Sequence, residues 1–400
     1  MKILLVTNLY PPQELGGYGR CMSDYCWGLQ QRGHHVTVLC HDAPYLGPSS
    51  HGPSGERVER ALQLKGSFEH GIQMLQDPGA CQRVDDWNRR CIAQLIQTAQ
   101  WDGLLIGNLD LLGPELLIQL LNEGIPTIHH VGFVSPPFPA DALPQAPNYC
   151  VAGASRTVQQ SLSAAGFSAQ PENVVYPGAR DDLLGQQFTG RALPEPLGGK
   201  AHNWRRLGAP DQPLKVCFAG LLMASKGAHT LVEALIQLKH QGLTVHATLS
   251  GAAFQAGYQD QLKGMLEQAG LTSEVTFTGN LTRPQLARMF VLHHIGVFPS
   301  IYPEAFGITG AEIQASGLAL VSSGVGGAAE LIEEGVTGLQ FEPGNGCDLA
   351  AKLLHLAQHP GLLVRIAANG QRRVRDRFSV VSSCTKLEQM FLDLQKRLER

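Results

Sequence analysis

The chain has 400 residues and a mass of 43.1 kDa, which exceeds one ordinary domain core and corresponds to two or three domains. Its 31 Lys and Arg residues against 34 Asp and Glu residues give a net charge of −3, which argues against a dedicated nucleic-acid-binding protein. Hydrophobic residues make up 44% of the chain, enough to build a core, so an intrinsically disordered chain is excluded.

The first half of the chain alternates strands and helices. Lys2–Asn8 predicts a buried strand, and a Pro- and Gly-rich loop, Tyr10–Gly19, leads into an amphipathic helix that ends near Gln31. His35–Cys40 predicts a second strand, so that strand, helix and strand form a βαβ unit typical of a parallel sheet. The later elements that we expect are helices at 84–99 and 114–122 and strands at 103–107, 126–130, 149–152 and 174–176.

The alternating pattern of strands and helices stops between Asp182 and Pro213, where the sequence is rich in Gly, Pro, Gln and Arg and shows no clear hydrophobic periodicity. A second alternating series follows, with strands expected at 214–219, 245–250, 275–278, 295–298 and 319–322 and helices at 228–241, 260–269, 283–292, 308–315 and 328–333. The last helix, Val380–Arg400, carries apolar residues at helical spacing. These patterns predict two doubly wound α/β domains, residues 1–185 and residues 214–379, joined by a linker at 186–213.

Two further features predict where the protein resides. The apolar run Ile3–Thr7 is too short for a secretory signal, and no window approaches the roughly 20 apolar residues that a membrane-spanning helix needs. The nine cysteines include no CxxC pair, which favours reduced thiols over a disulfide framework. We therefore expect a soluble, cytoplasmic protein.

Ligands of open α/β sheets bind outside the carboxyl ends of the strands, so the loops that follow strands are the places to search. After the first strand, Gly16 and Gly17 stand just ahead of a helix, where exposed backbone N–H groups can approach an anion. A dinucleotide fingerprint, GxGxxG, begins at Gly17, but Met22 occupies the position of its third glycine. We therefore favour contact with a phosphate or sugar over NAD binding, with a plain structural turn as the other alternative.

The second domain offers charged groups in the corresponding loops. Lys226 follows a strand and precedes a helix, where it can neutralise a phosphate, although such a lysine alone is more often a solvated surface residue. In the run Ser300–Gly317, Glu304 precedes a helix and Glu312 lies inside it, in apolar surroundings that require a partner for each acid. Carboxylates accept hydrogen bonds from sugar or ribose hydroxyls. The N–H groups at the start of this helix favour a diphosphate, and these are the amides of Phe306, Gly307 and Ile308. Acceptors for hydroxyls beside donors for phosphates indicate a sugar nucleotide.

Several motifs in this order resemble the family-4 retaining glycosyltransferases of the GT-B fold. They are Tyr10-Pro11-Pro12 with Gly16-Gly17, the segment Val151–Leu162, Tyr176-Pro177-Gly178, Lys226-Gly227, Glu304-x7-Glu312 with Phe306-Gly307, Gly326-Gly327-x-x-Glu330 and Gly335-x-x-Gly338. The resemblance covers nearly all of the chain. It implies two Rossmann-like domains that face each other across a cleft, with the helix 380–400 returning to the first domain. It also implies a metal-independent transfer of a sugar from a nucleotide-diphosphate sugar to an acceptor hydroxyl, with retention at the anomeric carbon and no cofactor.

The resemblance assigns roles to residues. Glu304 would hold the hydroxyls of the donor sugar and Glu312 the ribose, while Lys226 and the amides of the glycine loop and of Phe306 and Gly307 would hold the diphosphate. The histidine that lies beside the donor sugar in the family corresponds to His129, although the adjacent His130 leaves this assignment open. Judged without the family, either histidine is better read as a buried, hydrogen-bonded residue.

One position departs from the family pattern, because Leu221 stands where the family usually has an arginine that contacts the diphosphate. Charge neutralisation would then fall on Lys226, unless Arg283, Arg180 or Arg20 contributes. Two alternatives to an active transferase follow. One is a weak or inactive sugar-nucleotide-binding partner subunit, and the other is a GT-B nucleotide-sugar epimerase or hydrolase.

The identity of the substrates stays open at this level. The base can be uracil, guanine or adenine, and the acceptor can be a small molecule, a glycan or a lipid-linked sugar. Basic and acidic residues are nearly balanced within residues 1–100, which does not support a polybasic membrane face, so we expect at most transient membrane contact. We expect the acceptor to bind the first domain.

Overall fold

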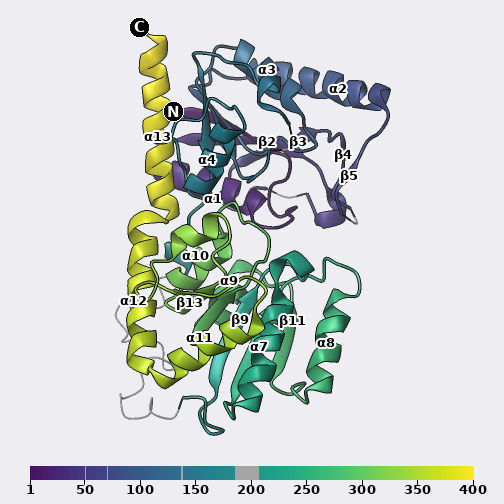
Figure 1. Cartoon of the computed structure of the whole chain (residues 1–400). Helices are drawn as coiled ribbons and strands as arrows, with labels where there is room; N and C mark the ends of the chain where they lie inside the picture. Colours follow the sequence, from purple (N-terminus) through teal and green to yellow (C-terminus); the bar gives the residue numbers. More distant parts are fainter. Residues whose placement is uncertain (50, 70, 137, 185–206) are drawn as a thin grey trace. The chain divides into compact units, whose positions relative to one another are not determined.

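The computed structural model describes residues 1–49, 51–69, 71–136, 138–184 and 207–400 (Figure 1). The chain divides into two compact units. The first consists of Met1–Pro177 together with Val380–Arg400, and the second of Gly178–Ser379. The boundary therefore follows Pro177, whereas the sequence placed residues up to 185 in the first domain. Most of the predicted linker, residues 186–206, lies outside the described residues.

The first unit is built on a parallel sheet. Its described strands have the order β3-β2-β1-β6-β7-β8. Their bounds are β1 Lys2–Val6, β2 His35–His41, β3 Arg57–Leu62, β6 Gly103–Ile106, β7 Thr127–Val131 and β8 Tyr149–Gly153. Leu4 of β1 is paired with Thr37 on one side and Leu104 on the other, and it is fully buried. Helices cover both faces of such a sheet, which explains the unbroken apolar runs of the central strands.

Helices from both ends of the chain pack on this sheet. They are α1 Tyr18–Gln31, α2 Pro78–Ile96, α3 Pro114–Asn122, α4 Arg156–Ala164 and α13 Val380–Leu398, with short 3-10 turns at Pro44–Leu46 and Ala140–Ala142. α13 lies against α1 (Figure 1), and the contact is close because a Cβ on Gly28 would stand 2.4 Å from the sulfur of Cys384. The apolar face predicted for the last helix is buried here, through Leu387, Phe391 and Leu394.

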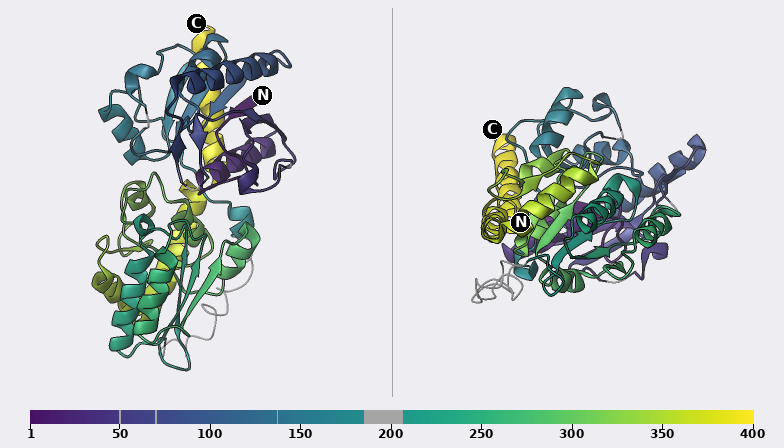
Figure 2. Two further views of the ribbon diagram at one scale, coloured as in Figure 1. Left: turned by 90° about the vertical axis from the view of Figure 1, so that its right-hand side faces the viewer. Right: turned by 60° about the horizontal axis from the view of Figure 1, so that its bottom comes forward.

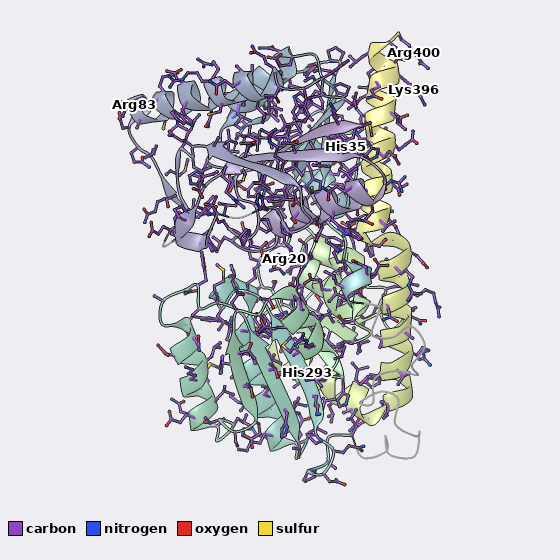
Figure 3. All side chains as sticks on the ribbon, turned by 180° about the vertical axis from the view of Figure 1, so that it is seen from behind. Arg20, His35, Arg83, His293, Lys396 and Arg400 are labelled. Atoms are coloured by element: carbon purple, nitrogen blue, oxygen red, sulfur yellow. The ribbon has the colours of Figure 1, made fainter. Side chains whose placement is uncertain are left out.

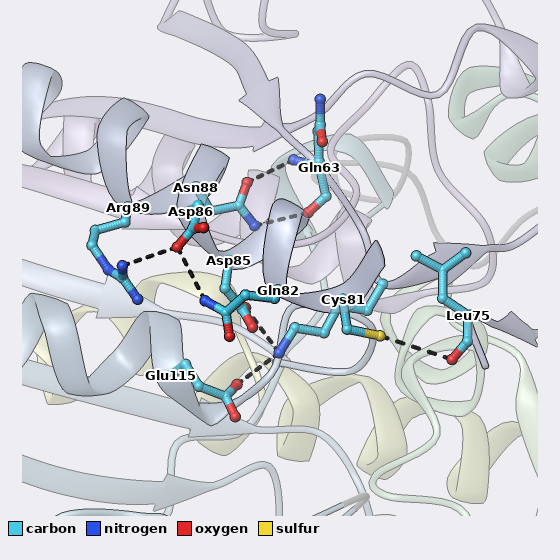
Figure 4. A network of polar contacts seen from close by, with 10 residues as sticks. Gln63, Leu75, Cys81, Gln82, Asp85, Asp86, Asn88, Arg89 and Glu115 are labelled. Atoms are coloured by element: carbon cyan, nitrogen blue, oxygen red, sulfur yellow. Dashed lines mark hydrogen bonds and ion pairs between the residues drawn. The ribbon is translucent and has the colours of Figure 1, made fainter. Parts of the chain in front are cut away.

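Polar contacts fix the outer part of this unit (Figure 4). This part also contains a small hairpin of β4 Gly66–Ser67 and β5 Gln73–Met74. The side-chain amide of Asn88 on α2 exchanges two hydrogen bonds, of 2.8 and 2.9 Å, with the backbone of Gln63 just after β3. Lys65 bridges α2 and α3 through Asp85 and Glu115, each at 2.8 Å. These contacts tie the helices to the edge of the sheet.

The second unit is also built on a parallel sheet with helices packed on it. Its described strands have the order β11-β10-β9-β12-β13-β14 and are all parallel. The bounds are β9 Leu214–Ala219, β10 Val245–Ser250, β11 Val275–Gly279, β12 Ile295–Phe298, β13 Ala319–Ser322 and β14 Leu339–Gln340. The helices are α5 Asp181–Leu184, α7 Ala228–His240, α8 Tyr258–Gln268, α9 Arg283–Phe290, α10 Ile308–Ala315, α11 Gly346–Gln358 and α12 Pro360–Arg377. Figure 2 shows this sheet with helices packed on it. Two doubly wound parallel sheets confirm the predicted fold class.

Charged side chains gather on the surface of both units. Arg83 on α2 and Lys396 and Arg400 near the end of the chain extend outward, whereas His293 lies inside the second unit (Figure 3). Among the described residues, no helix combines the length and the apolar character needed to span a membrane.

Two segments predicted as a strand and a helix form neither in the structure. The strand expected at 174–176 is a single bridge between Gly153 and Val174, since Pro177 follows it directly and cannot donate a ladder hydrogen bond. The helix expected at 328–333 is a 3-10 turn, η6, at Gly327–Leu331. Another 3-10 turn, η5, covers Ala224–Lys226.

The strand order places a topological switch point in each sheet. In the first unit it lies between β1 and β6, and in the second between β9 and β12, because the connections leave these neighbouring strands in opposite directions. The crevice outside the carboxyl ends of such strands is where open α/β sheets bind ligands.

Candidate functional site

The loops that leave β9 and β12 meet at the switch point of the second unit. Backbone N–H of Ile301 donates to the carbonyl of Ser225 over 2.9 Å and so joins the two loops. Gly227 ends the 3-10 turn η5 with a φ of 71°, and a Cβ there would stand 1.9 Å from the carbonyl oxygen of Pro299. Only glycine permits this approach. The close packing brings the residue before Gly227, Lys226, to the loop after β12.

Lys226 and Glu304 form an ion pair at this point. The Lys226 Nζ lies 2.6 Å from Glu304 Oε1, and the two side chains are 32% and 16% exposed. The hydroxyl of Ser300 donates to the same carboxylate oxygen, and the hydroxyl of Ser323 donates to the carbonyl of Ser300. Two predicted site residues that are 78 positions apart in the sequence therefore share one hydrogen-bonded cluster at the sheet edge.

The Gly326-Gly327 turn holds the backbone of Glu304. N–H of Gly327 donates to the Glu304 carbonyl over 2.7 Å, and N–H of Glu304 donates to the Val325 carbonyl over 3.3 Å. Gly326 has a φ of 64°, and a Cβ there would stand 2.4 Å from the Glu304 oxygen. This turn therefore fixes the position of Glu304.

The helix α10 begins directly after this cluster. Gly307 is its N-cap, so the N–H groups of Ile308 and its successors open the helix, where they lack intrahelical acceptors and favour an anion. The Phe306 side chain is 1% exposed and packs against Phe378 with ring centroids 5.5 Å apart. Phe306 can therefore offer a ligand its backbone, while its ring belongs to the core.

Glu312 lies one turn further along α10 and is 1% exposed. Arg283, the first residue of α9, places its Nη2 3.5 Å from Glu312 Oε1. This contact supplies the partner that a buried carboxylate requires. The structure thus keeps Lys226, Glu304, Gly307, Ile308 and Glu312 within one unit, on the loops after β9 and β12 and on the helix that follows.

Leu221 follows β9 and is partly buried. The three arginines that could compensate for the missing family arginine all have acidic partners. Arg283 contacts Glu312, Arg180 holds Asp182 with two hydrogen bonds of 2.7 Å, and Arg20 lies 3.3 Å from Glu14. Of these, Arg283 stands beside a residue of the candidate site.

The glycine loop belongs to the first unit. Gly17 is the N-cap of α1, and Gly16 before it has a φ of 70°. The loop is fixed by Arg60 of β3, whose guanidinium donates to the carbonyls of Pro11 at 2.7 Å and Tyr10 at 3.1 Å and to the side chain of Gln13 at 3.1 Å. Sequence reasoning did not single out Arg60, because nothing in its neighbourhood links it to residues nearly 50 positions earlier.

His129 and His130 point to opposite faces of β7, and both are buried. His129 Nδ1 lies 2.9 Å from the Tyr149 hydroxyl, while His130 Nε2 lies 2.9 Å from the Val175 carbonyl and its Nδ1 3.0 Å from the Tyr18 hydroxyl. Burial lowers the pKa of His129 to about 3 and that of His130 to about 4, so both are neutral at pH 7. The role of His129 beside a donor sugar stays a prediction.

The second unit matches a known protein family. Residues 200–373 match the model of the glycosyl transferases group 1. Over its whole length the chain is 28% identical to a glycogen synthase of Mycobacterium tuberculosis, of which the match covers 96%. It is 33% identical to a D-inositol 3-phosphate glycosyltransferase of an Arthrobacter species over 39% of this chain and 37% of that protein.

A solved structure extends the likeness to the fold of the full chain. The Anabaena protein HepE, crystallised with UDP and glucose, superposes with a TM-score of 0.71 at 22% identity. The superposition covers 98% of this chain and 100% of HepE. At this identity the likeness concerns the fold.

Proposed function

We propose that the chain is a glycosyltransferase of group 1 that moves a sugar from a nucleotide-diphosphate sugar to an acceptor hydroxyl, with retention at the anomeric carbon and without a metal ion. The observation that carries this proposal is the Lys226–Glu304 pair at the switch point of the second unit, next to the first N–H groups of α10. It offers a cation and N–H donors to a diphosphate beside a carboxylate for hydroxyls. The UDP and glucose that HepE binds are a ligand of this class.

Each group has a task in the proposed reaction. Lys226 and the N–H groups of Gly307 and Ile308 would hold the diphosphate, together with the glycine loop at Gly16 and Gly17. Glu304 would accept hydrogen bonds from the donor sugar, and Glu312 from the ribose. The bond between the anomeric carbon and the diphosphate oxygen breaks as the acceptor oxygen attacks from the same face. The acceptor proton passes to the departing diphosphate, so the main task of the protein is to stabilise the charge that grows there.

The ion pair also suggests how Lys226 and Glu304 divide between the two parts of the donor. Glu304 is only 16% exposed, and Lys226 neutralises the charge of its carboxylate. A bound diphosphate would give Lys226 a second anion and leave the Glu304 carboxylate to the sugar hydroxyls. The hydroxyl of Ser300 would keep Glu304 oriented during this exchange.

The test compares two variants of the pair with matched controls. Thermal-shift screening against UDP, GDP and ADP first identifies the base, since a ligand that binds the folded state raises the melting temperature. Glu304→Gln and Lys226→Ala are then expected to abolish sugar transfer and to leave the melting temperature of the unliganded protein nearly unchanged. Lys352→Ala and Glu334→Gln are the controls, because Lys352 is 31% exposed and pairs with Glu334 at 3.8 Å in the same unit.

The outcomes separate the alternatives. Near-normal transfer by both Glu304→Gln and Lys226→Ala would contradict the proposed roles. Nucleotide binding without turnover of any donor would favour the partner subunit, and consumption of the nucleotide sugar without an acceptor would favour an epimerase or hydrolase. Retention is read from the anomeric proton coupling of the product, and metal independence from a rate that EDTA does not change.

A further inference from the structure

The switch point of the first unit carries a polar pair in the same position as the pair of the second unit. Asn8 follows β1 and Asp110 follows β6, the two strands that flank the switch point. The side-chain amide of Asn8 donates to Asp110 Oδ1 over 2.7 Å. Asn8 is held in this orientation because its own Oδ1 accepts a hydrogen bond from the N–H of Leu9, also at 2.7 Å.

Asp110 differs from the other acids of the candidate sites in having no cationic partner among the residues that the structure describes. Glu304 faces Lys226 and Glu312 faces Arg283, whereas within the described part of the chain no Lys, Arg or His forms an ion pair with Asp110. Burial raises the pKa of Asp110 to about 6, and a backbone hydrogen bond opposes this effect. A partly buried carboxylate without a cation still needs hydrogen-bond donors, and Asn8 supplies one.

The backbone beside Asp110 is strained. Leu111 has a φ of 59°, and it is the one non-glycine residue with positive φ in the described chain. Side chains with a Cβ avoid this region, and residues held there cluster at binding and active sites. Its carbonyl accepts from the N–H of Lys65 over 2.6 Å, which fixes the loop in this form. The fold therefore maintains an unfavourable backbone conformation next to an acid without a cation.

Neighbouring loops complete a polar rim around this position. Asn108 accepts a hydrogen bond of 2.9 Å from the N–H of Gly132, just after β7. A Cβ on Gly132 would stand 2.3 Å from the Tyr18 ring at the start of α1. Burial first, and then the charges of Cys21 and Asp110, raise the pKa of Tyr18, so Asp110 lies near Tyr18. Polar groups from β1, β6, β7 and α1 thus gather at one edge of the sheet.

We propose that Asn8 and Asp110 bind a hydroxyl of the acceptor other than the attacking one and that this site selects uncharged carbohydrate or polyol acceptors over phosphorylated ones. This inference rests on the proposed sugar transfer and specifies its acceptor class. The Asp110 carboxylate accepts a hydrogen bond from this second acceptor hydroxyl, and Asn8 keeps the carboxylate oriented. A phosphate at the same place would meet a negative charge that no cation of the described residues neutralises.

The basic residues of the neighbouring loops are already engaged. Arg60 donates to the carbonyls of the Tyr10–Pro11 turn, Arg20 lies beside Glu14, and Lys65 is shared by Asp85 and Glu115.

The experiment uses matched acceptors with the full chain and the nucleotide sugar that the thermal-shift screen identifies. Transfer rates are compared for myo-inositol and D-inositol 3-phosphate, and for glucose, maltotriose and glucose 6-phosphate. We expect the neutral member to be preferred in each comparison. In Asp110→Asn, which keeps an oxygen for Asn8, we expect the KM of the neutral acceptor to rise by about tenfold through loss of a charge-assisted hydrogen bond, with donor affinity unchanged. The discrimination against the phosphorylated member should shrink.

Two further variants keep the result interpretable. Asp102→Asn is the control, because Asp102 accepts a hydrogen bond from the N–H of Lys2 at the amino ends of the strands, away from Asn8 and Asp110. This substitution should change neither the acceptor KM nor the donor KM. Asn8→Ala, which removes the orienting donor, should raise the acceptor KM if Asp110→Asn does not fold. The inference is overturned if the enzyme prefers the phosphorylated acceptors, or if the acceptor KM is unchanged in both Asp110→Asn and Asn8→Ala. In either case, sugar transfer to any of these acceptors still upholds the proposed function. The proposed function itself fails if no nucleotide sugar binds the protein and no sugar is transferred.

Discussion

The substitution Gly326→Ala separates the position of Glu304 from its chemistry. The new Cβ would stand 2.4 Å from the Glu304 carbonyl oxygen and 2.8 Å from its nitrogen, so it must recede by about 1 Å to reach an ordinary contact. A displacement of about 1 Å at a substrate-binding group costs roughly 100-fold in rate. Because Glu304 and Lys226 keep their identities, the loss would arise only from the shifted backbone.

The cost in stability follows from the backbone conformation. Gly326 has a φ of 64°, and placing a residue with a Cβ in this region costs about 1–2 kcal/mol. For a unit of this size, each kcal/mol lowers the melting temperature by about 2–4 °C. Gly335→Ala is the matched control, because Gly335 has a φ of 71° in the same unit and a Cβ there meets no atom within 4 Å.

Both variants are measured by thermal unfolding, by calorimetric titration with the nucleotide, and by kcat/KM for sugar transfer. We expect a lower melting temperature in both variants, with the larger loss in Gly326→Ala because its Cβ also meets the Glu304 backbone, and a drop of about 100-fold in kcat/KM for Gly326→Ala alone. Equal kcat/KM values in Gly326→Ala and Gly335→Ala would refute the reasoning, since the contact with Glu304 is the difference between them.

Three other predictions can be tested with the same protein. Arg60→Ala deprives the Pro11 and Tyr10 carbonyls of their donor, so we expect about 1–3 kcal/mol less stability in urea unfolding and weaker nucleotide-sugar turnover; turnover equal to wild type would show that the glycine loop needs no such support. Leu221→Arg adds a cation after β9 and should tighten nucleotide diphosphate binding in calorimetry, and an unchanged dissociation constant would mean that this side chain does not reach the diphosphate. Burial lowers the pKa of His130 to about 4 from an ordinary 6.5, so between these values the unfolded chain binds more protons, and stability should fall as the pH drops through this window. His130→Gln should flatten this part of the urea-midpoint profile between pH 7 and pH 4, and an unaltered slope would assign the effect to other groups.

The sequence predicts the sheets well, because their central strands are short apolar runs separated by helices of regular period. It misses β3, Arg57–Leu62, because a half-exposed edge strand with charged residues lacks an apolar run. The start of α2 was placed too late at 84, although Asp77 and Pro78 form a typical N-cap and first position, with the Asp77 carboxylate accepting from Gly79 and Ala80. Both misses concern local signals that are weaker than hydrophobic periodicity.

The residues of the candidate site also fall into those that the sequence predicts and those that only the structure reveals. Lys226, Glu304 and Glu312 can be found from the sequence, since each is a charged residue in or just after a loop that follows an apolar strand. The groups that orient them cannot, because Ser300, Gly326 and Arg283 act through contacts that depend on how separate loops fold together. Asn8 and Asp110 are 102 positions apart, and only the strand order reveals that their loops are neighbours.

The packing of α13 on α1 has a consequence for the order in which the chain can fold. The second unit is inserted into the first, and its two boundaries lie together, since N–H of Ala179 donates to the Phe378 carbonyl over 2.7 Å. During synthesis the second unit can be completed as soon as Ser379 has emerged, while the α1 surface around Gly28 stays exposed until α13 follows. The unit that begins first is therefore finished last, and its unpaired helix face is the surface on which a chaperone or a misplaced segment can act in the meantime.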